Sequence, residues 1–597
     1  MSAAPSQTPP TPTRGGPSLR QRIDDWVSDP NPILVKELRA IFRTDLFVRF
    51  LYLSTGIVAL IVLGIGAAVA AGNESPATVG QVVFHLFFGV TLFVITLIAP
   101  GAAAASITSE REQHTWESLV LSGMSAERIV AGKFVASYAS TGLVVVAMSP
   151  IVGIAFLFGG ISPVQVFVGL LSMLIALAPA IAFGVAISAH LSSTRLAIAA
   201  ATIVYFPIAV IYTSTMSGFG SVAHRAWGLS FEGPFFYADA FATRAGEWDT
   251  WVLIGGGALY FFGMPVWFLL ASAVAGVRPP AEDRSSALKV WAVAMSVTTV
   301  LTAAVICAVQ PGLSDSASSG QFVIGATGIL LAFYALVFSN EPPLPPGPYR
   351  LAMAKASSPR RAFAALGPGA GTTLRFTTLA IVLTSLAVAG ATIGARHLLF
   401  PSGNHLRHDV AALVAAGGVA AVGVFAAALG SWFRLSLRHG LAARVLTTAI
   451  LFAFAILPFM LVLVVDTYAL DAMPRRIPGL LQPSIVYPFL LATHIVETGA
   501  VQDAWRVVIP IALYGLPALG LWLLIEGRVR RLTKQVDADR EAHRASAEKR
   551  ASIPPQAPRI SRPSADPASQ EATAEPEDSA AAPPEPKPEP PPPEADG

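Results

Sequence analysis

The chain has 597 residues, of which 53% are hydrophobic and only 13% are charged. Ordinary soluble domains carry about 25% charged residues, so this composition excludes a typical soluble protein and indicates a chain that lies largely in a membrane. The net charge is +3, but the cations flank apolar stretches and do not gather with aromatic residues in one patch, so no nucleic-acid partner is expected. The single cysteine, Cys307, excludes a disulfide within the chain.

The apolar stretches predict an all-α, polytopic fold with about twelve transmembrane helices. A helix needs about 20 mainly apolar residues to cross the hydrocarbon layer, because its backbone groups must be bonded within the segment. The predicted spans are 50–71, 82–106, 134–158, 164–189, 196–216, 251–275, 289–309, 321–338, 376–395, 410–433, 445–465 and 506–525. Prolines inside these spans, such as Pro150, predict kinks. Residues 1–30 do not resemble a signal peptide, so the first span is expected to direct insertion.

Lysine and arginine counts predict the orientation of these spans. Basic residues concentrate in alternate short loops, among them the loops at 107–133 and 339–375, and they also flank the first and last spans. Because basic loops stay in the cytoplasm, both termini are expected there, in a multi-pass protein of the cell inner membrane. Two long outer loops, 217–250 and 466–505, contain aromatic segments that are too short to span and are expected to form short helices partway into the membrane.

Both ends of the chain are predicted to be disordered cytoplasmic tails. Residues 1–30 are rich in Pro, Ser and Thr, and residues 531–597 are charged and then rich in Pro, Glu and Ala. Neither segment has enough large apolar side chains to form a core. The mixed-charge part of the second tail, to about residue 550, is interpreted as a plain tether, with a solvated helix as the alternative.

The segment before the first span predicts an amphipathic helix that lies flat at the membrane interface. Asn31 is a suitable N-cap, and Pro32 follows at the first helical position. At 100° per residue an apolar face lies opposite a basic one. The basic face is expected to contact anionic headgroups of membrane lipids; its residues are Lys36, Arg39 and Arg43. A plain basic flank of the first span is the alternative.

The loop at 109–133, between the second and third spans, carries the strongest functional signal. Ser109 and Glu112 have the spacing of a capping box, which predicts that a short helix begins at Ser109. Gly123 then predicts a stop, and Ser125 is expected to cap a second helix that continues into the third span. A helix joined rigidly to a span can transmit motion from a docked soluble partner, although a solvent-facing loop helix does not require one.

These two segments resemble the ABC-2 family of exporter permeases. The family has an interfacial helix before its first span and, after its second span, a coupling loop with a charged cluster, a Thr, a bulky residue, an acid, leucines and a Gly-Lys. The resemblance implies that an ATPase subunit couples to this loop. The matching residues are Glu110, Arg111, Glu112, Thr115, Trp116, Glu117, Leu119, Gly132 and Lys133. Two residues depart from the family pattern: His114, where the family usually has Gly, and Gly123, where it usually has Pro.

The resemblance continues beyond the loop, and part of the pattern repeats in the second half of the chain. The turn between the fourth and fifth spans resembles the family's Gly, Ser, Arg and Thr pattern, and an outer Pro-Phe pair resembles its re-entrant element; the residues are Gly184, Ser188, Ser193, Arg195, Thr202, Pro234 and Phe235. Gly430, Thr448, Pro488 and Phe489 repeat that order. We therefore expect two six-span halves, 31–280 and 281–530, forming a pseudo-dimer, with a homodimer as the other possible assembly. The second half lacks the acidic capped helix of the first.

The remaining motifs narrow the function. The chain has no G-x-x-x-x-G-K-S/T motif, and Gly132-Lys133 lacks the upstream glycine and the hydroxyl, so no enzyme activity and no cofactor are expected in this chain. ATP and Mg would bind to a partner ATPase. His85 in the second span is a possible pathway residue, or else bonds a helix carbonyl. Two alternative functions remain open. One is a non-transporting membrane scaffold. The other is a membrane-embedded acyl or glycosyl transferase, for which the only candidate site residues are the outer group His397, His405, His408 and Asp409.

Overall fold

The computed structural model describes residues 31–72, 74–231, 233–309, 317–339, 341–354, 366–399, 401, 405–437, 440–465 and 477–551. Regular structure in these ranges is entirely helical, and eleven of the helices are long and apolar enough to cross a membrane. The predicted span 321–338 falls on α16 (Ala317–Phe338), of which the described apolar part is Gly325–Phe338. The protein is therefore a polytopic helical membrane protein, as predicted. The predicted tail segments 1–30 and 552–597 lie outside the described residues.

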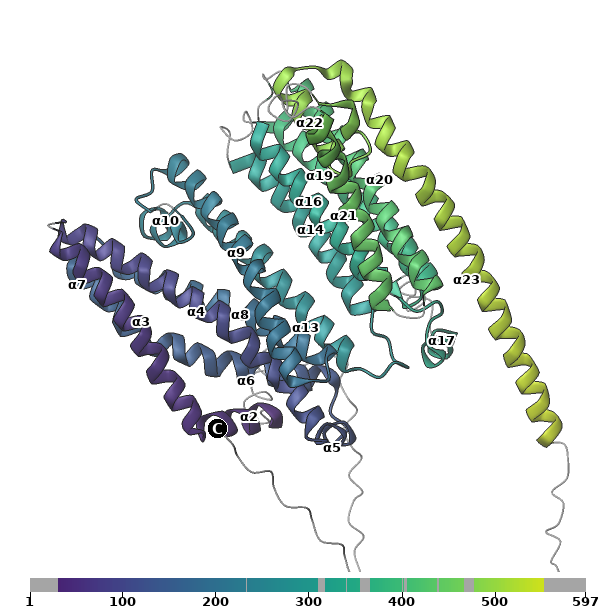
Figure 1. The fold of residues 1–597 in the computed structure, drawn as a ribbon, viewed down its shortest axis with the longest axis horizontal. Helices are drawn as coiled ribbons and strands as arrows, with labels where there is room; N and C mark the ends of the chain where they lie inside the picture. Colours follow the sequence, from purple (N-terminus) through teal and green to yellow (C-terminus); the bar gives the residue numbers. More distant parts are fainter. Residues whose placement is uncertain are drawn as a thin grey trace, which may run out of the picture. The chain divides into compact units, whose positions relative to one another are not determined.

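The helices before residue 280 form what we call the first bundle (Figure 1). They are α2 (Pro32–Phe42), α3 (Asp45–Ala71), α4 (Pro76–Glu112), α5 (Trp116–Leu121), α6 (Ala126–Ala147), α7 (Ser149–Phe158), α8 (Pro163–His190), α9 (Thr194–Trp227), α10 (Phe236–Arg244), α11 (Trp248–Thr250), α12 (Gly256–Ala258) and α13 (Met264–Val277). In this bundle, the most extensive helix–helix packing is that of α4 against α8 and α9. Phe84, Phe87 and Phe88 of α4 are fully buried in its hydrophobic core, so α4 is the central helix of the bundle.

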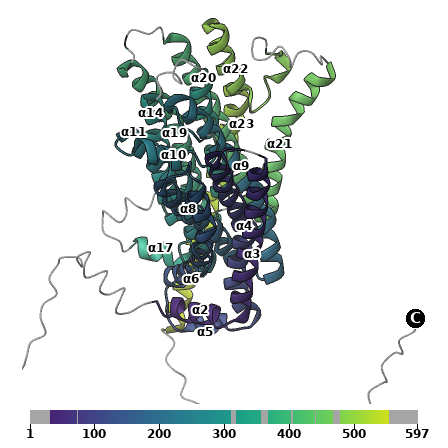
Figure 2. The ribbon, with the colours of Figure 1, turned by 90° about the vertical axis from the view of Figure 1, so that its left-hand side faces the viewer.

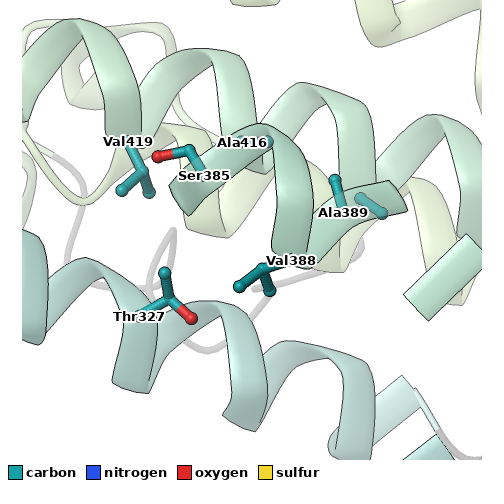
Figure 3. Close-up of a pocket in the computed structure, with 7 residues that line it drawn as sticks. Thr327, Ser385, Val388, Ala389, Ala416 and Val419 are labelled. Atoms are coloured by element: carbon teal, nitrogen blue, oxygen red, sulfur yellow. The ribbon is translucent and has the colours of Figure 1, made fainter. Parts of the chain in front are cut away.

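The helices after residue 285 form the second bundle. They are α14 (Ser286–Val309), α16, α17 (Gly347–Ala354), α19 (Ala370–Leu399), α20 (Leu406–Ser436), α21 (Gly440–Val465), α22 (Tyr487–Thr498) and α23 (Val508–Ala551). Here α20 packs along α16, α19 and α22. A small cavity between α16, α19 and α20 is lined mainly by apolar side chains, with Thr327 and Ser385 at its edge (Figure 3).

Local sequence explains where several helices begin. The side chain of Asn31 accepts a hydrogen bond from the Ile33 N–H at the start of α2, and Ser125 accepts one from Arg128 N–H at the start of α6, both as predicted. Ser162 and Gln165 form a complete capping box at the start of α8. In each case a polar side chain satisfies a backbone donor that the helix itself leaves unbonded.

Several helices depart from straight, regular spans. The third span breaks between α6 and α7 at Met148, two residues before Pro150, where the sequence predicts a kink. The sixth span contains two π-helical turns, Trp251–Gly255 and Leu259–Gly263. The segment 531–551, interpreted from sequence as a plain tether, instead continues α23 as a helix to Ala551. Alternating charges three and four residues apart favour this helix over a random tether.

The short helices gather at the ends of the bundles. In the first bundle, α2 and α5 lie together at one end and α10 lies at the other (Figures 1 and 2). In the second bundle, α17 and α22 likewise lie at opposite ends. The helices α10 and α22 fall in the long loops where the sequence predicts short helices. The end that carries α2 and α5 is the one that the charge pattern predicts to be cytoplasmic.

Candidate coupling site

The interfacial helix α2 is docked on the start of α6. The side chain of Asn31 donates a hydrogen bond to the Arg128 carbonyl oxygen at 2.6 Å. A Cβ added to Gly132 would lie 2.9 Å from Asn31 Nδ2 and 3.0 Å from Ile33 Cβ. Because such distances are shorter than normal contacts, only glycine allows α2 to approach α6 this closely. Gly132 therefore contacts α2 and not solvent.

Lys133 joins three helices at a buried charge cluster. Its side chain is 0% exposed, and its Nζ lies 3.1 Å from Glu37 of α2 and 3.1 Å from Glu110 of α4. It also donates a hydrogen bond to the Ser106 carbonyl oxygen at 2.7 Å. Lys36 of α2 binds the same Glu110 carboxylate at 3.2 Å from a largely exposed position. We call Lys36, Glu37, Glu110 and Lys133 the first lysine cluster, and it links α2, α4 and α6.

The last turn of α4 also binds the turn between α8 and α9. Ser188 is fully buried, and its Oγ accepts hydrogen bonds from the Ile107 and Thr108 N–H groups at 2.9 and 3.1 Å. The Arg111 guanidinium donates to the Leu191 carbonyl oxygen at 2.9 Å. The Glu112 carboxylate accepts from the Thr194 N–H at 2.7 Å. The predicted coupling residues Glu110, Arg111 and Glu112 thus bind other helices of the same bundle.

The prediction that a helix begins at Ser109 is wrong. The second span does not end near residue 106 but continues as α4 to Glu112, and the Ser109 carbonyl accepts a regular helical hydrogen bond from Gln113 N–H. No glycine or proline interrupts residues 102–112, so nothing ends the helix before the capping box. Contacts with α8 then hold the extra turns in place. The short loop helix is α5, which begins at Trp116.

A tight turn connects α4 to α5. His114 has φ +56°, the left-handed conformation that glycine adopts most easily, at the position where the sequence departs from a Gly pattern. Thr115 Oγ1 donates to the Glu110 carbonyl oxygen at 3.3 Å, which closes the turn. The Arg111 guanidinium lies 5.2 Å from the centre of the Trp116 ring, within the range of a cation–π contact. After α5, Gly123 has φ +75° and provides the predicted stop.

The exposed surface of α5 is small and consists of apolar and acidic side chains. Leu121 is 85% exposed and Val120 is 47% exposed. Glu117 is exposed beside them, whereas Trp116 and Leu119 are partly buried. These exposed side chains face away from the bundle at the α2–α5 end. Of the predicted coupling residues, Glu117 is the one on this open surface of α5.

The basic face of α2 is open as well. Lys36, Arg39 and Arg43 are exposed, and Ile33 is buried against α6. A helix that buries Ile33 and exposes basic residues fits the flat orientation that the sequence predicts. Arg278, which follows α13, forms an ion pair with Glu127 in the first turn of α6. The sixth span is thereby tied to the same end of the bundle.

His85 lies near the start of α4, far from the coupling loop, and packs beside the segment that precedes α10. Its Nδ1 lies 2.8 Å from the Gln81 carbonyl oxygen, and its ring packs 4.7 Å from the Phe231 ring. The segment with Phe231 is held by Asp239, which is buried and binds Gln165 at 3.0 Å and the Phe231 N–H at 3.2 Å. Sequence reasoning missed Asp239; an acidic residue within the aromatic segment was the available signal.

The histidine group that the sequence predicts on the outer side is brought together only in part. His397 lies 2.7 Å from Asp409, and Arg396 binds the same carboxylate at 3.2 Å. The rings of His397 and His405 are 5.3 Å apart. Among the described residues, no group of three or more His, Cys, Asp or Glu side chains could hold a metal ion. The Asp409 carboxylate therefore binds Arg396 and His397.

Comparison with known proteins supports the resemblance drawn from the coupling loop. The model of the family "ABC-2 family transporter protein" matches residues 48–238, which extend from the start of the first span to α10. No curated protein and no solved structure matches the chain. Residues 48–238 contain α4, α5, α6 and the contacts of α4 with Ser188, Leu191 and Thr194, whereas Lys36 and Glu37 of the first lysine cluster precede them. Residues 48–238 are therefore similar to the membrane region of ABC-2 family transporter proteins, which supports an ABC-2 type permease.

Proposed function

We propose that this chain is the transmembrane permease subunit of an ABC-2 type exporter, and that a separate ATPase subunit docks on α5 at the cytoplasmic face. The observation that carries the proposal is the joint arrangement of an open apolar surface and buried links. Leu121 and Val120 are adjacent exposed apolar side chains on α5, and an apolar surface rimmed by polar residues is typical of a protein–protein contact. The end of α4, which precedes α5 in the chain, is bonded to α2, α6, α8 and α9.

Energy is proposed to reach the membrane through these links. When the partner closes on ATP and Mg, it displaces α5, and the turn at His114 passes the displacement to α4. The first lysine cluster then carries α2 and α6 along. Gly132 and Lys133 do not offer a nucleotide site themselves, because Gly132 is packed against Asn31 and the Lys133 amino group is occupied by two carboxylates.

The test is co-purification from native membranes. We expect an ATPase to be recovered with the native chain and to be stimulated by it. Leu121→Asp is expected to reduce recovery about tenfold or more, since a central apolar anchor of an interface typically contributes more than about 1.4 kcal/mol. Leu351→Asp is the matched control, because Leu351 is 51% exposed on α17 in the second bundle. Undiminished recovery with Leu121→Asp, or recovery of other proteins but no ATPase, would contradict the proposal and favour a scaffold.

The proposed orientation has an independent test. A Ser122→Cys variant in a Cys307→Ala background places one exposed thiol beside α5, and Glu247→Cys places one at the opposite end of the bundle. A membrane-impermeant maleimide should label Ser122→Cys only in inside-out vesicles and Glu247→Cys only in right-side-out vesicles. The reverse pattern would put α5 outside the reach of any cytoplasmic ATPase.

A further inference from the structure

The start of α9 lacks a cap of its own. Ser193 occupies the N-cap position, yet its side chain makes no capping hydrogen bond. The first N–H groups of a helix have no partner within the helix and favour a negative charge. At α9 that partner is the Glu112 carboxylate from the last residue of α4, 2.7 Å from the Thr194 N–H. The cap is therefore supplied by a different helix, 82 residues away in the chain.

The same two helices are in close contact further into the membrane. A Cβ on Gly101 of α4 would lie 2.8 Å from Thr202 Oγ1 of α9, and a Cβ on Gly184 of α8 would lie 2.2 Å from the Pro100 carbonyl oxygen. Such contacts between small residues allow helix backbones to approach closely in a membrane. The Gly184, Ser188 and Thr202 pattern in the sequence thus serves to pack α8 and α9 against α4.

We propose that Glu112 is a positioning residue that ties the start of α9 to the end of α4, so that the fifth span moves with the second when α5 is displaced. Arg111 supports the tie by binding the Leu191 carbonyl oxygen in the same turn. This inference rests on the proposed function, because a docked ATPase supplies the displacement. It adds a second route from α5, separate from the first lysine cluster, which leads to α2 and α6.

Three variants separate the tie from general stability. Glu112→Ala removes the acceptor, whereas Glu112→Gln keeps an amide oxygen that can accept from Thr194 N–H. Thr194→Pro removes the donor itself at the first helical position, where proline is well tolerated. Ser193 has φ −101° and ψ 125°, an extended conformation compatible with a following proline. Glu112→Ala and Thr194→Pro should therefore have the same effect, and combining them should add little.

The first measurement uses the isolated full chain. Hydrogen exchange at the Thr194 amide should become about tenfold faster or more in Glu112→Ala, because a hydrogen bond to a charged group is lost. Exchange in Glu112→Gln should stay within a few-fold of the native rate. Unchanged exchange in Glu112→Ala would overturn the inference whether or not an ATPase binds.

The second measurement uses the complex with the co-purified ATPase. In a Cys307→Ala background, nitroxide labels at Leu60→Cys on α3 and Ile203→Cys on α9 report the separation of these helices, since the two positions are 76% and 71% exposed. Labels at Leu60→Cys and Phe167→Cys on α8 form the control pair that omits α9. We expect ATP with vanadate to shift the α3–α9 distance in the native complex and in Glu112→Gln. In Glu112→Ala and Thr194→Pro the equilibrium constant for that shift should fall by about 2- to 30-fold.

The outcomes distinguish this inference from the proposed function. A native chain that recovers no ATPase contradicts the proposed function, and the exchange measurement still decides whether Glu112 caps α9. A native-size shift of the α3–α9 pair in Glu112→Ala overturns the inference while leaving the docking of the ATPase intact. Loss of the shift together with normal ATP hydrolysis supports it, because a misfolded variant would lose both.

Discussion

Among the residues that the structure describes, the first and second bundles each bury one lysine completely, but the two lysines have different partners. Lys133 binds two carboxylates, Glu37 and Glu110. Lys289 of α14 is also 0% exposed, and its Nζ donates at 2.6 Å to the neutral Gly367 carbonyl oxygen and at 2.6 Å to Thr373 Oγ1. Glu341 lies near Lys289, but its carboxylate accepts a hydrogen bond from the Gly369 N–H at 3.3 Å.

The difference lies in what each lysine connects. Lys133 and its carboxylates join helices that come from distant parts of the chain, with the open surface of α5 close by. Lys289 instead holds the segment before α19 against the start of α14, and Ser286 Oγ adds a hydrogen bond to the Leu366 carbonyl oxygen. Charge–charge attraction acts over a longer range than a hydrogen bond to a neutral group. The first arrangement can therefore stay associated while helices shift, whereas the second is suited to closing a loop.

Lys133→Met should have the largest effect. It leaves Glu37 and Glu110 side by side in a mostly buried position, and breaking a buried pair by removing one partner costs about 3–5 kcal/mol. Thermal unfolding in detergent should detect this loss. Lys36→Ala is the control: Lys36 is 65% exposed on its side chain, and an exposed pair contributes about 0–1 kcal/mol. Equal effects of the two variants would show that burial does not set the strength of the cluster.

Lys289→Met should cost less. Its two hydrogen-bond partners, the Gly367 carbonyl and the Thr373 hydroxyl, are neutral, and an unsatisfied buried neutral group costs about 1–3 kcal/mol. The nearby Glu341 keeps its hydrogen bond from the Gly369 N–H. The same unfolding measurement applies, with hydrogen exchange at residues 366–369 to show that the damage is local. A loss as large as that of Lys133→Met would remove the distinction between the two lysines.

Much of the fold could be predicted from the sequence because it depends on local rules. Apolar length located the spans, and Asn31, Ser125 and Gly123 marked helix ends through capping and backbone freedom. The wrong start at Ser109 shows the limit of such rules: a capping box acts only where the helix before it has already ended. Here α4 has no breaking residue, and contacts with Ser188 reinforce its last turns.

The candidate site was predictable in its residues and not in their contacts. The charges at 110–112 suggested an exposed coupling surface, yet each of them binds another helix. Lys133 is buried because Glu37, nearly 100 residues earlier, folds over it. Such pairings depend on how helices pack, which spacing along the chain does not reveal. The exposed surface of α5 could be identified only after the structure showed that the charges at 110–112 are bound within the bundle.

The loop turns offer a smaller comparison. In the first bundle His114 adopts φ +56°, whereas the second bundle has Gly369 at φ +119° before α19. A side chain in the left-handed region costs about 1 kcal/mol. We therefore expect His114→Gly to stabilise the protein by up to about 1 kcal/mol in thermal unfolding. His114→Ala retains the Cβ and should bring no such gain; if it did, the histidine side chain and not the backbone would be the cause.

The smallest expected effect is the pH dependence of the loop at residues 366–369, which Lys289 and Glu341 hold. Burial raises the pKa of Glu341 above the ordinary value for a glutamate, and the Lys289 ammonium group opposes that rise without cancelling it. Since the pKa is higher in the folded than in the unfolded state, protonation favours the folded loop: the added stability is full below the unfolded pKa and is lost as pH rises through the raised one. The protection factor of the Gly369 amide should therefore increase when the pH is lowered from 7.

Glu341→Gln should abolish this pH dependence, and Glu247→Gln, at an exposed position in the first bundle, should leave it unchanged. A protection factor that instead falls on acidification would mean that the Lys289 attraction outweighs burial, and that the second lysine, like the first, is held mainly by charge.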